Sequence, residues 1–185
     1  MNLIRKFENS PPLKLIYDNI SFFLDHPIRR MFNDPVKKVE AAGIHSGMSV
    51  LEVGCGSGYF TIPAAKLVGD EGCLHAIDIH PIAVGNVSRR VMDSNLRNVI
   101  ITKTNALDTG FPRESYDKIL LFGVIPAPVL PLEKLLPEMH RLLRTCGSMA
   151  VWTGFPLWSP SKVTRSRLFT YTGKRDGVHN FTRNS

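Results

Sequence analysis

The chain has 185 residues, a formal net charge of +7 and a hydrophobic share of 43%. This length suits one α/β core and is too short for a second substrate domain of ordinary size, so we expect one compact domain. No segment approaches the roughly 20 consecutive apolar residues of a membrane span. Residues 1–6 are followed by charges and by Pro11 and Pro12, so we expect no secretory signal.

The cysteines and the basic charge narrow the class of protein further. Cys55, Cys73 and Cys146 lack the paired spacing of a disulfide framework or a zinc site, so we expect a reducing cytoplasm and no metal. Part of the positive charge lies in residues 162–183, which brings nucleic acid into consideration. Because no interleaved aromatic and basic motif of the RNA-recognition type is present, RNA is the less favoured partner class.

The first predicted element is an amphipathic helix over residues 13–24. Its apolar side chains recur at helical spacing and need a surface to cover them: Leu13, Ile16, Ile20, Phe23 and Leu24. Packing on the domain itself is the favoured interpretation. A membrane-surface helix is an alternative because Lys14 and Arg29 flank the apolar face, although Asp18 and Asp25 weigh against it.

An apolar strand over residues 49–53 then runs into three alternating glycines, Gly54, Gly56 and Gly58. Glycine adopts backbone angles closed to other residues and lets the main chain approach a ligand closely. A helix beginning near Tyr59 directs unpaired N–H groups and a partial positive charge at the same place. The segment therefore predicts a cradle for the anionic tail of a cofactor.

The next strand, over residues 74–77, ends at Asp78. Nucleotide-binding folds place a ribose-binding carboxylate about 20 residues after the glycines, and Asp78 fits that position. Asp78 has a second candidate role as N-cap of a helix begun by Pro81, and both roles stay open. The glycine spacing G-x-G-x-G differs from the dinucleotide fingerprint G-x-G-x-x-G, which weighs against a dehydrogenase.

The pattern Glu52-x-Gly54-x-Gly56-x-Gly58 followed by Asp78 resembles that of the class I S-adenosylmethionine-dependent methyltransferases. The resemblance covers the chain from about residue 35 to its end. It implies S-adenosylmethionine as cofactor, with the glycine loop at its methionine end, Asp78 at the ribose hydroxyls and the following residue against adenine. The implied cofactor-binding set is Glu52, Gly54, Cys55, Gly56, Ser57, Gly58, Asp78, Ile79, Asn105, Ala106 and Phe122.

Two later stretches bear on adenine and on the methyl acceptor. The family's third motif is commonly Gly-Asp-Ala, and here it reads Thr104-Asn105-Ala106, whose amide can still accept a hydrogen bond from the adenine amine. Residues 122–126 lack the Asn/Asp-Pro-Pro-aromatic motif that methylases of DNA or glutamine carry after strand four. Residues 122–132 are proline-rich and apolar, so they wall an acceptor site or form a rigid, buried connection.

The remaining elements predict the fold class. Strands over residues 99–104, 118–122 and 148–153 alternate with helical patterns, which indicates a parallel sheet. Residues 132–143 carry a core-packing leucine stripe, with Gly147 as the expected helix stop. Residues 168–182 form a predicted hairpin. With the resemblance, the expected fold is an α/β three-layer sandwich whose mostly parallel seven-stranded sheet ends in an antiparallel C-terminal hairpin.

The helix expected before the sixth strand must fit within residues 155–167, which contain Pro156 and Pro160, so we expect it to be reduced. The resemblance also divides the chain into an N-terminal helical segment, residues 1–34, and a methyltransferase domain, residues 35–185. Family members often build a lid from their N-terminal segment, which gives the first of these regions a second candidate role.

The function expected from the resemblance is methyl transfer to a small-molecule acceptor, of the type found in quinone biosynthesis. A non-catalytic S-adenosylmethionine-binding partner subunit is the first alternative, and an NAD-dependent oxidoreductase is a weaker one. His26, His45, His80 and His140 are the histidines considered as a general base, and none is assigned that role.

Overall fold

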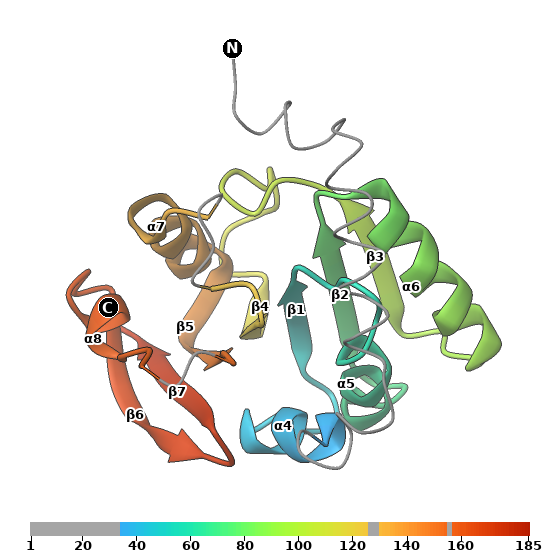
Figure 1. Cartoon of the computed structure of the whole chain (residues 1–185), viewed down its shortest axis with the longest axis horizontal. Coiled ribbons are helices and arrows are strands. Elements are labelled where there is room, and N and C mark those ends of the chain that lie inside the picture. The colour runs from blue at the N-terminus through green and yellow to red at the C-terminus, as the bar shows by residue number, and fades with distance from the viewer. Residues whose placement is uncertain (1–33, 126–129, 155–156) are drawn as a thin grey trace.

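The computed structural model describes residues 34–125, 130–154 and 157–185. Over these ranges the chain forms a seven-stranded sheet with strand order β3-β2-β1-β4-β5-β7-β6, as Figure 1 shows. The predicted helix over residues 13–24 lies outside the described residues, and so do Pro126 and Pro128 of the predicted acceptor wall. These two interpretations therefore stay predictions.

The elements follow the predicted alternation through most of the chain, and their bounds are α4 (Pro35–Ala41), β1 (Ser49–Val53), α5 (Thr61–Val68), β2 (Cys73–Asp78), α6 (Pro81–Asp93), β3 (Val99–Lys103), β4 (Tyr116–Phe122), α7 (Leu132–Leu142), β5 (Leu143–Trp152), α8 (Ser161–Thr164), β6 (Phe169–Arg175) and β7 (Val178–Arg183). The pairs β1–β2, β1–β4, β2–β3 and β4–β5 are parallel. Strand β7 pairs antiparallel with both β5 and β6. The predicted fold class is confirmed.

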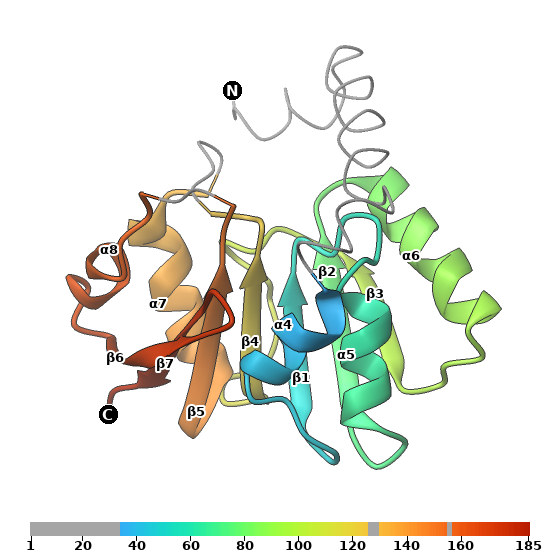
Figure 2. The same ribbon diagram turned by 60° about the horizontal axis from the view of Figure 1, so that its bottom comes forward.

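Helices cover both faces of the sheet because successive strand residues point to opposite sides. Leu51 and Val53 of β1 pack in one cluster with Leu135 and Met139 of α7. Val50, the residue before Leu51, packs instead with residues of α4 and α5. Figure 2 shows α4 and α5 in front of the strands and α7 behind them. The three layers therefore follow from the alternation of buried residues along β1.

The C-terminal hairpin closes the sheet through a tight turn. Asp176 and Gly177 connect β6 to β7 with φ values of 46° and 79°. Two residues with positive φ form the turn whose twist matches paired antiparallel strands. The predicted hairpin is confirmed, and α8 before it has only 4 residues, in line with the expected reduced helix.

The predicted helix stop at Gly147 is wrong. Helix α7 ends at Leu142, and β5 begins at the next residue, Leu143. Strand β5 pairs with β4 at Leu143, and its register then shifts before pairing resumes at Ser148. Gly147 lies inside that irregularity, where a Cβ atom would meet the carbonyl oxygen of Arg144 at 2.8 Å. Close packing of the bulged strand, and not helix termination, explains this glycine.

The connection from β3 to β4 contains no helix. Residues 104–115 run from one strand to the next as turns and extended segments. Parallel strands usually need a crossover of a dozen or more residues, most often helical. Here the connection is a loop that must be held in place by side chains, as described below. Over the part of the chain that the structure describes, no helix is long and apolar enough to cross a membrane.

Lys118 on β4 is a charged residue in the core, with 5% of its surface exposed. Burial, reinforced by the nearby Arg175, lowers the pKa of its amine to about 8. The folded state therefore binds a proton less tightly than the unfolded chain, whose lysine titrates near 10.5. This difference makes the free energy of unfolding rise with pH between about 8 and 10.5.

Replacing Lys118 by methionine should stabilise the protein at pH 7 by up to about 3 kcal/mol, since the cost of a buried charge disappears while the aliphatic chain is kept. The pH dependence above pH 8 should flatten as well. Urea unfolding at several pH values measures both effects. Lys134→Met, at an exposed position on α7, is the matched control and should leave stability within about 0.5 kcal/mol. Equal effects from the two substitutions would contradict the assignment.

Candidate cofactor-binding site

The glycine loop after β1 is fastened to the end of β2 by three backbone N–H groups. Those of Gly54 and Cys55 both donate to the carbonyl oxygen of Ile77, at 2.8 and 3.0 Å. The next free N–H, that of Gly56, donates to Oδ2 of Asp78 at 3.1 Å. The predicted loop and the predicted ribose carboxylate therefore lie in direct contact at the carboxyl edge of the sheet.

Asp78 is held by main-chain donors that do not exhaust the acceptor capacity of its carboxylate. Its Oδ1 accepts the N–H of His80 at 2.8 Å, while Oδ2 accepts that of Gly56. The two carboxylate oxygens have about four lone-pair sites together, so acceptor capacity for a ligand hydroxyl remains after the N–H groups of His80, Gly56 and Ile79 are counted. Burial raises the pKa of Asp78, and the N–H groups of His80 and Gly56 offset part of this increase.

The prediction that Asp78 caps the following helix is wrong. The N-cap of α6 is His80, whose Nδ1 accepts the N–H of Ile82 at 3.3 Å, and Pro81 occupies the first helical position. Asp78 lies two residues too early, and its oxygens bond to the glycine loop and to His80 itself. The carboxylate is therefore directed at the loop and not at the end of α6.

Gly54 packs against the side chain of Val124. Its φ is +71°, and a Cβ atom at this position would lie 2.2 Å from Cγ1 of Val124, in the segment that follows β4. The φ values of Gly56 and Gly58 are also positive, at 54° and 82°. Glycine adopts these backbone angles without the strain that a side chain would add, so the tight turn needs glycine here.

Glu52 is the buried acid beneath the loop, with 2% of its surface exposed. Its Oε2 accepts a hydrogen bond from the Thr61 hydroxyl, in the first turn of α5, at 2.6 Å. Burial raises the pKa of Glu52 to about 8, against the opposing effect of the Thr61 hydrogen bond. The carboxyl group is therefore protonated at neutral pH.

Cys55 is not activated as a nucleophile. Only 4% of its surface is exposed, and burial, together with the neighbouring carboxyl groups of Glu52 and Asp78, raises the pKa of its thiol. The thiolate is the reactive form of cysteine. Cys55 accordingly acts as a small residue in the loop, as the sequence interpretation favoured.

The remaining predicted cofactor residues also lie at the carboxyl edge. Thr104 N–H donates to the carbonyl oxygen of Asp78 at 3.0 Å, which brings Asn105 and Ala106 beside the end of β2. Asn105 is half-buried and Ala106 is buried. The ring of Phe122 packs edge-on against Phe60 with centroids 5.0 Å apart, so a cofactor contact from Phe122 would come from its main chain. Ile79 is half-buried next to Asp78, and Ser57 is buried in the loop.

The structure adds three supporting residues that sequence reasoning missed. Thr61 holds Glu52, Val124 lies against Gly54, and Arg90 of α6 donates from Nη1 to the carbonyl oxygen of Ser57 at 2.6 Å. Arg90 follows the loop by more than thirty positions, and no local pattern links the two. Only the packing of α6 beside α5 brings its guanidinium to the glycine loop.

The histidines considered as a base have structural contacts. His80 caps α6 through Nδ1. Nε2 of His140 bonds the carbonyl oxygen of Asn184 at 2.9 Å, and Nδ1 of His45 bonds that of Ser46. His26 lies outside the described residues. Among the residues that the structure places, no group of three His, Cys, Asp or Glu side chains could hold a metal ion.

Comparison with known proteins agrees with this geometry. Residues 44–158, more than half of the chain, match the model of a methyltransferase domain family. An aklanonic acid methyltransferase of Streptomyces sp. strain C5 is 33% identical over 104 residues, which is 56% of this chain and 44% of that protein. A demethylmenaquinone methyltransferase of Listeria welshimeri is 30% identical over 108 residues, 58% of this chain and 45% of that protein.

A solved structure shares the fold more completely. It is that of a SAM-dependent methyltransferase from Aquifex aeolicus, with a TM-score of 0.73 and 22% identity over 89% of this chain and 96% of that one. The chain therefore belongs to the class I S-adenosylmethionine-dependent methyltransferases, with S-adenosylmethionine as its cofactor. The match spans less than half the length of each of the two curated relatives named above.

The residues at the carboxyl edge fit S-adenosylmethionine. The glycine loop turns tightly beside Asp78, and Asp78 has acceptor capacity left for ribose hydroxyls. The carboxyl group of Asp78 also suits a ligand with a net positive charge, which the sulfonium and ammonium groups of this cofactor provide. These contacts are the basis of the proposal below.

Gly54→Ala should destabilise the domain by about 2–4 kcal/mol, because the added methyl group meets Val124 and the positive φ is strained for a side chain. Thermal or urea unfolding measures the change. Gly85→Ala is the matched control: Gly85 lies inside α6 with nothing within 4 Å of an added Cβ, so alanine should stabilise by about 0.5–1 kcal/mol. A harmless Gly54→Ala would contradict the described loop.

Glu52→Gln should change how stability varies with pH. In the wild type the folded state keeps the Glu52 proton between pH 4.5 and about 8 while the unfolded chain loses it, so stability falls as pH rises through this window. Glutamine is neutral throughout, so the stability of the variant should not fall over this window. The unfolding free energy of the variant minus that of the wild type should therefore be about 3 kcal/mol larger at pH 7 than at pH 4. Urea titrations at pH 4 to 8 test this, with exposed Glu71→Gln as the control. Parallel pH profiles for Glu52→Gln and the wild type would refute a neutral Glu52.

Proposed function

We propose that the protein transfers a methyl group from S-adenosylmethionine to a small-molecule acceptor. The observation that carries the proposal is the contact between the glycine loop and Asp78, which assembles a ligand cradle at the carboxyl edge of a methyltransferase fold. The cofactor-binding set proposed is the one predicted from the sequence, with Asp78 at the ribose, Ile79, Asn105 and Ala106 at adenine, and the loop at the methionine end.

When bound, S-adenosylmethionine supplies a methyl group that is bonded to a positively charged sulfur. The sulfur is the leaving group and becomes a neutral thioether. Transfer would require the acceptor lone pair to approach the methyl carbon opposite the C–S bond, whose electron pair would pass to sulfur. The contribution of the protein is then to hold both partners in line and to exclude water. Asp78 and the glycine loop serve the holding step, and no side chain is assigned as general base.

The acceptor class is inferred from two sources. The names of the curated relatives refer to aklanonic acid and demethylmenaquinone, both small molecules. The segment after β4 begins Gly123-Val124-Ile125 and lacks the motif that holds an amino group of DNA or glutamine. RNA is the less favoured acceptor, and the three free cysteines agree with a site of action in the cytoplasm.

Calorimetric titration with S-adenosylmethionine, S-adenosylhomocysteine and NAD is the first test. Micromolar binding of the two sulfur ligands without NAD binding would support the site. Transfer of radiolabelled methyl groups from S-adenosylmethionine to a small-molecule extract then tests catalysis. Cofactor binding without transfer to any extract fraction would favour a non-catalytic partner subunit, and NAD binding alone would overturn the proposal.

Asp78→Ala should weaken S-adenosylmethionine binding by about 10- to 100-fold, since the hydrogen bonds to the ribose are lost while the strands that carry them remain. The dissociation constant from calorimetry is the measurement, with circular dichroism to show that the variant is folded. Asp70→Ala removes an equal charge from an exposed turn and should bind as the wild type does. Unchanged affinity in folded Asp78→Ala would remove Asp78 from the ribose site.

A further inference from the structure

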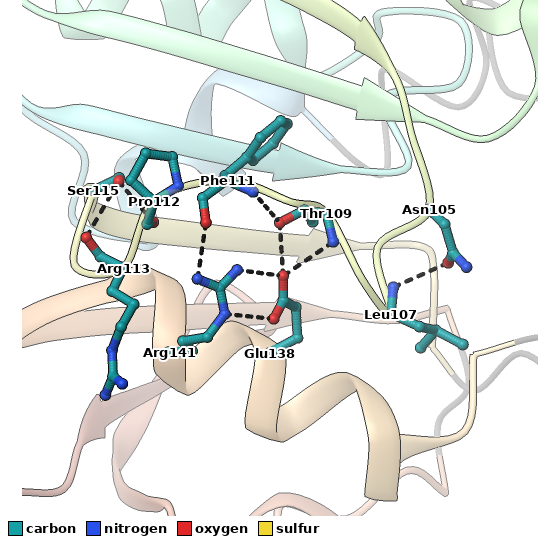
Figure 3. Close-up of polar contacts among 9 residues, drawn as sticks. All are labelled: Asn105, Leu107, Thr109, Phe111, Pro112, Arg113, Ser115, Glu138 and Arg141. Atoms are coloured by element: carbon teal, nitrogen blue, oxygen red, sulfur yellow. Dashed lines mark hydrogen bonds and ion pairs between the residues drawn. The ribbon is translucent and has the colours of Figure 1, made fainter.

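The loop that replaces a helix between β3 and β4 is fastened along its length to α7. Figure 3 shows the contacts, which come from two side chains of α7, Glu138 and Arg141. The loop begins with Asn105 and Ala106, the proposed adenine contacts. Its far end, residues 111–115, leads into β4. The attachment therefore connects a helix on one face of the sheet with one end of the candidate cofactor site.

Glu138 is the centre of the attachment. Its Oε1 accepts hydrogen bonds from the Thr109 N–H at 3.0 Å, the Thr109 hydroxyl at 2.6 Å and Arg141 Nη2 at 2.7 Å. Its Oε2 accepts a hydrogen bond from Arg141 Nε at 2.8 Å. The bonds from Arg141, followed by those from Thr109, lower the pKa of Glu138 to about 2. The carboxylate is charged throughout the working pH range, and the contact does not switch with pH.

Arg141 and the end of α7 hold the second half of the loop. Arg141 Nη1 donates to the carbonyl oxygen of Phe111 at 2.8 Å. The N–H groups of Glu114 and Ser115 donate to the carbonyl oxygens of Arg141 and Leu142, at 3.0 and 2.9 Å. Carbonyl groups at the end of a helix lack helical partners, and here the loop supplies them.

Asn105 is oriented by the first turn of the same loop. Its Oδ1 accepts the Leu107 N–H at 3.0 Å, and its carbonyl oxygen accepts the Asp108 N–H at 3.1 Å. The amide oxygen therefore has a fixed direction and one remaining lone pair. Thr109 comes directly after this turn and is 7% exposed, so its bonds to Glu138 hold the turn from the C-terminal side.

We propose that Glu138 and Thr109 are positioning residues that hold the Asn105 amide oxygen toward the adenine amino group and so determine the choice of adenine over hypoxanthine. The inference rests on the proposed function, because it needs adenine at the Asn105 turn. Adenine presents a donor amine at carbon 6, whereas hypoxanthine presents an acceptor oxygen. A fixed amide oxygen accepts from the first and repels the second, but an amide free to rotate would bind both.

The test compares the affinities of S-adenosylhomocysteine and S-inosylhomocysteine by calorimetry. The wild type should prefer the adenine ligand. Thr109→Val keeps the shape of the side chain but removes the hydroxyl, and it should lower the preference by about fivefold. Thr109→Ser keeps a hydroxyl at this position and should retain the preference for the adenine ligand. Glu138→Gln should reduce the preference at least as much, and Glu133→Gln, an exposed acid of the same helix, should not.

The ratio of the two affinities separates positioning from a purely structural role. A loop that only supports the fold would, when weakened, lower both affinities together and leave the ratio unchanged, and that result would overturn the inference alone. Equal wild-type affinities would do the same. A wild type that binds neither ligand would overturn the proposed function and this inference with it. If Glu138→Gln does not fold, the Thr109→Val and Thr109→Ser pair still decides the question.

Discussion

The carbonyl oxygen of Ile77 receives two consecutive N–H groups, from Gly54 and Cys55, and the candidate site depends on this convergence. A strand that continued straight would pair one N–H with one carbonyl group of its neighbour. Two N–H groups on one oxygen turn the chain across the sheet edge, so the next one, from Gly56, meets the Asp78 carboxylate. The same turn starts α5 where Thr61 reaches Glu52. A side chain at Gly54 would collide with Val124 and push this turn away from the edge.

Two buried ionisable groups, Glu52 on β1 and Lys118 on β4, lie toward opposite ends of neighbouring strands. Glu52 pairs with Leu120, and Lys118 lies two residues earlier on the same strand. Burial is the first cause of both pKa shifts, upward for the acid and downward for the amine. Glu52 lies under the glycine loop, where the Thr61 hydroxyl at the start of α5 donates to its carboxyl group. Lys118 lies toward the opposite end of the sheet, away from the candidate site, where its burial lowers the stability of the fold.

The loop between β3 and β4 shows how the fold manages without a crossover helix there. A helix satisfies its own backbone groups, whereas a loop of this length needs outside partners. Glu138, Arg141 and the last carbonyl groups of α7 provide them. The consequence is that one end of the candidate site is held by an ion pair on the far face of the sheet. Glu138 and Arg141 thus shape the candidate site without contacting a ligand themselves.

The sequence by itself determined the strands, the closing hairpin, the glycine loop and Asp78, because hydrophobic periodicity, turn residues and glycine spacing are local signals. It misplaced the helix stop at Gly147, since a bulge in β5 and a helix end carry the same glycine signature. It assigned a second role to Asp78 that His80 performs. Only the tertiary structure decided that Arg90, Val124 and Glu138 support the site, because each contact joins segments distant in sequence, and its partner is set by how helices pack on the sheet.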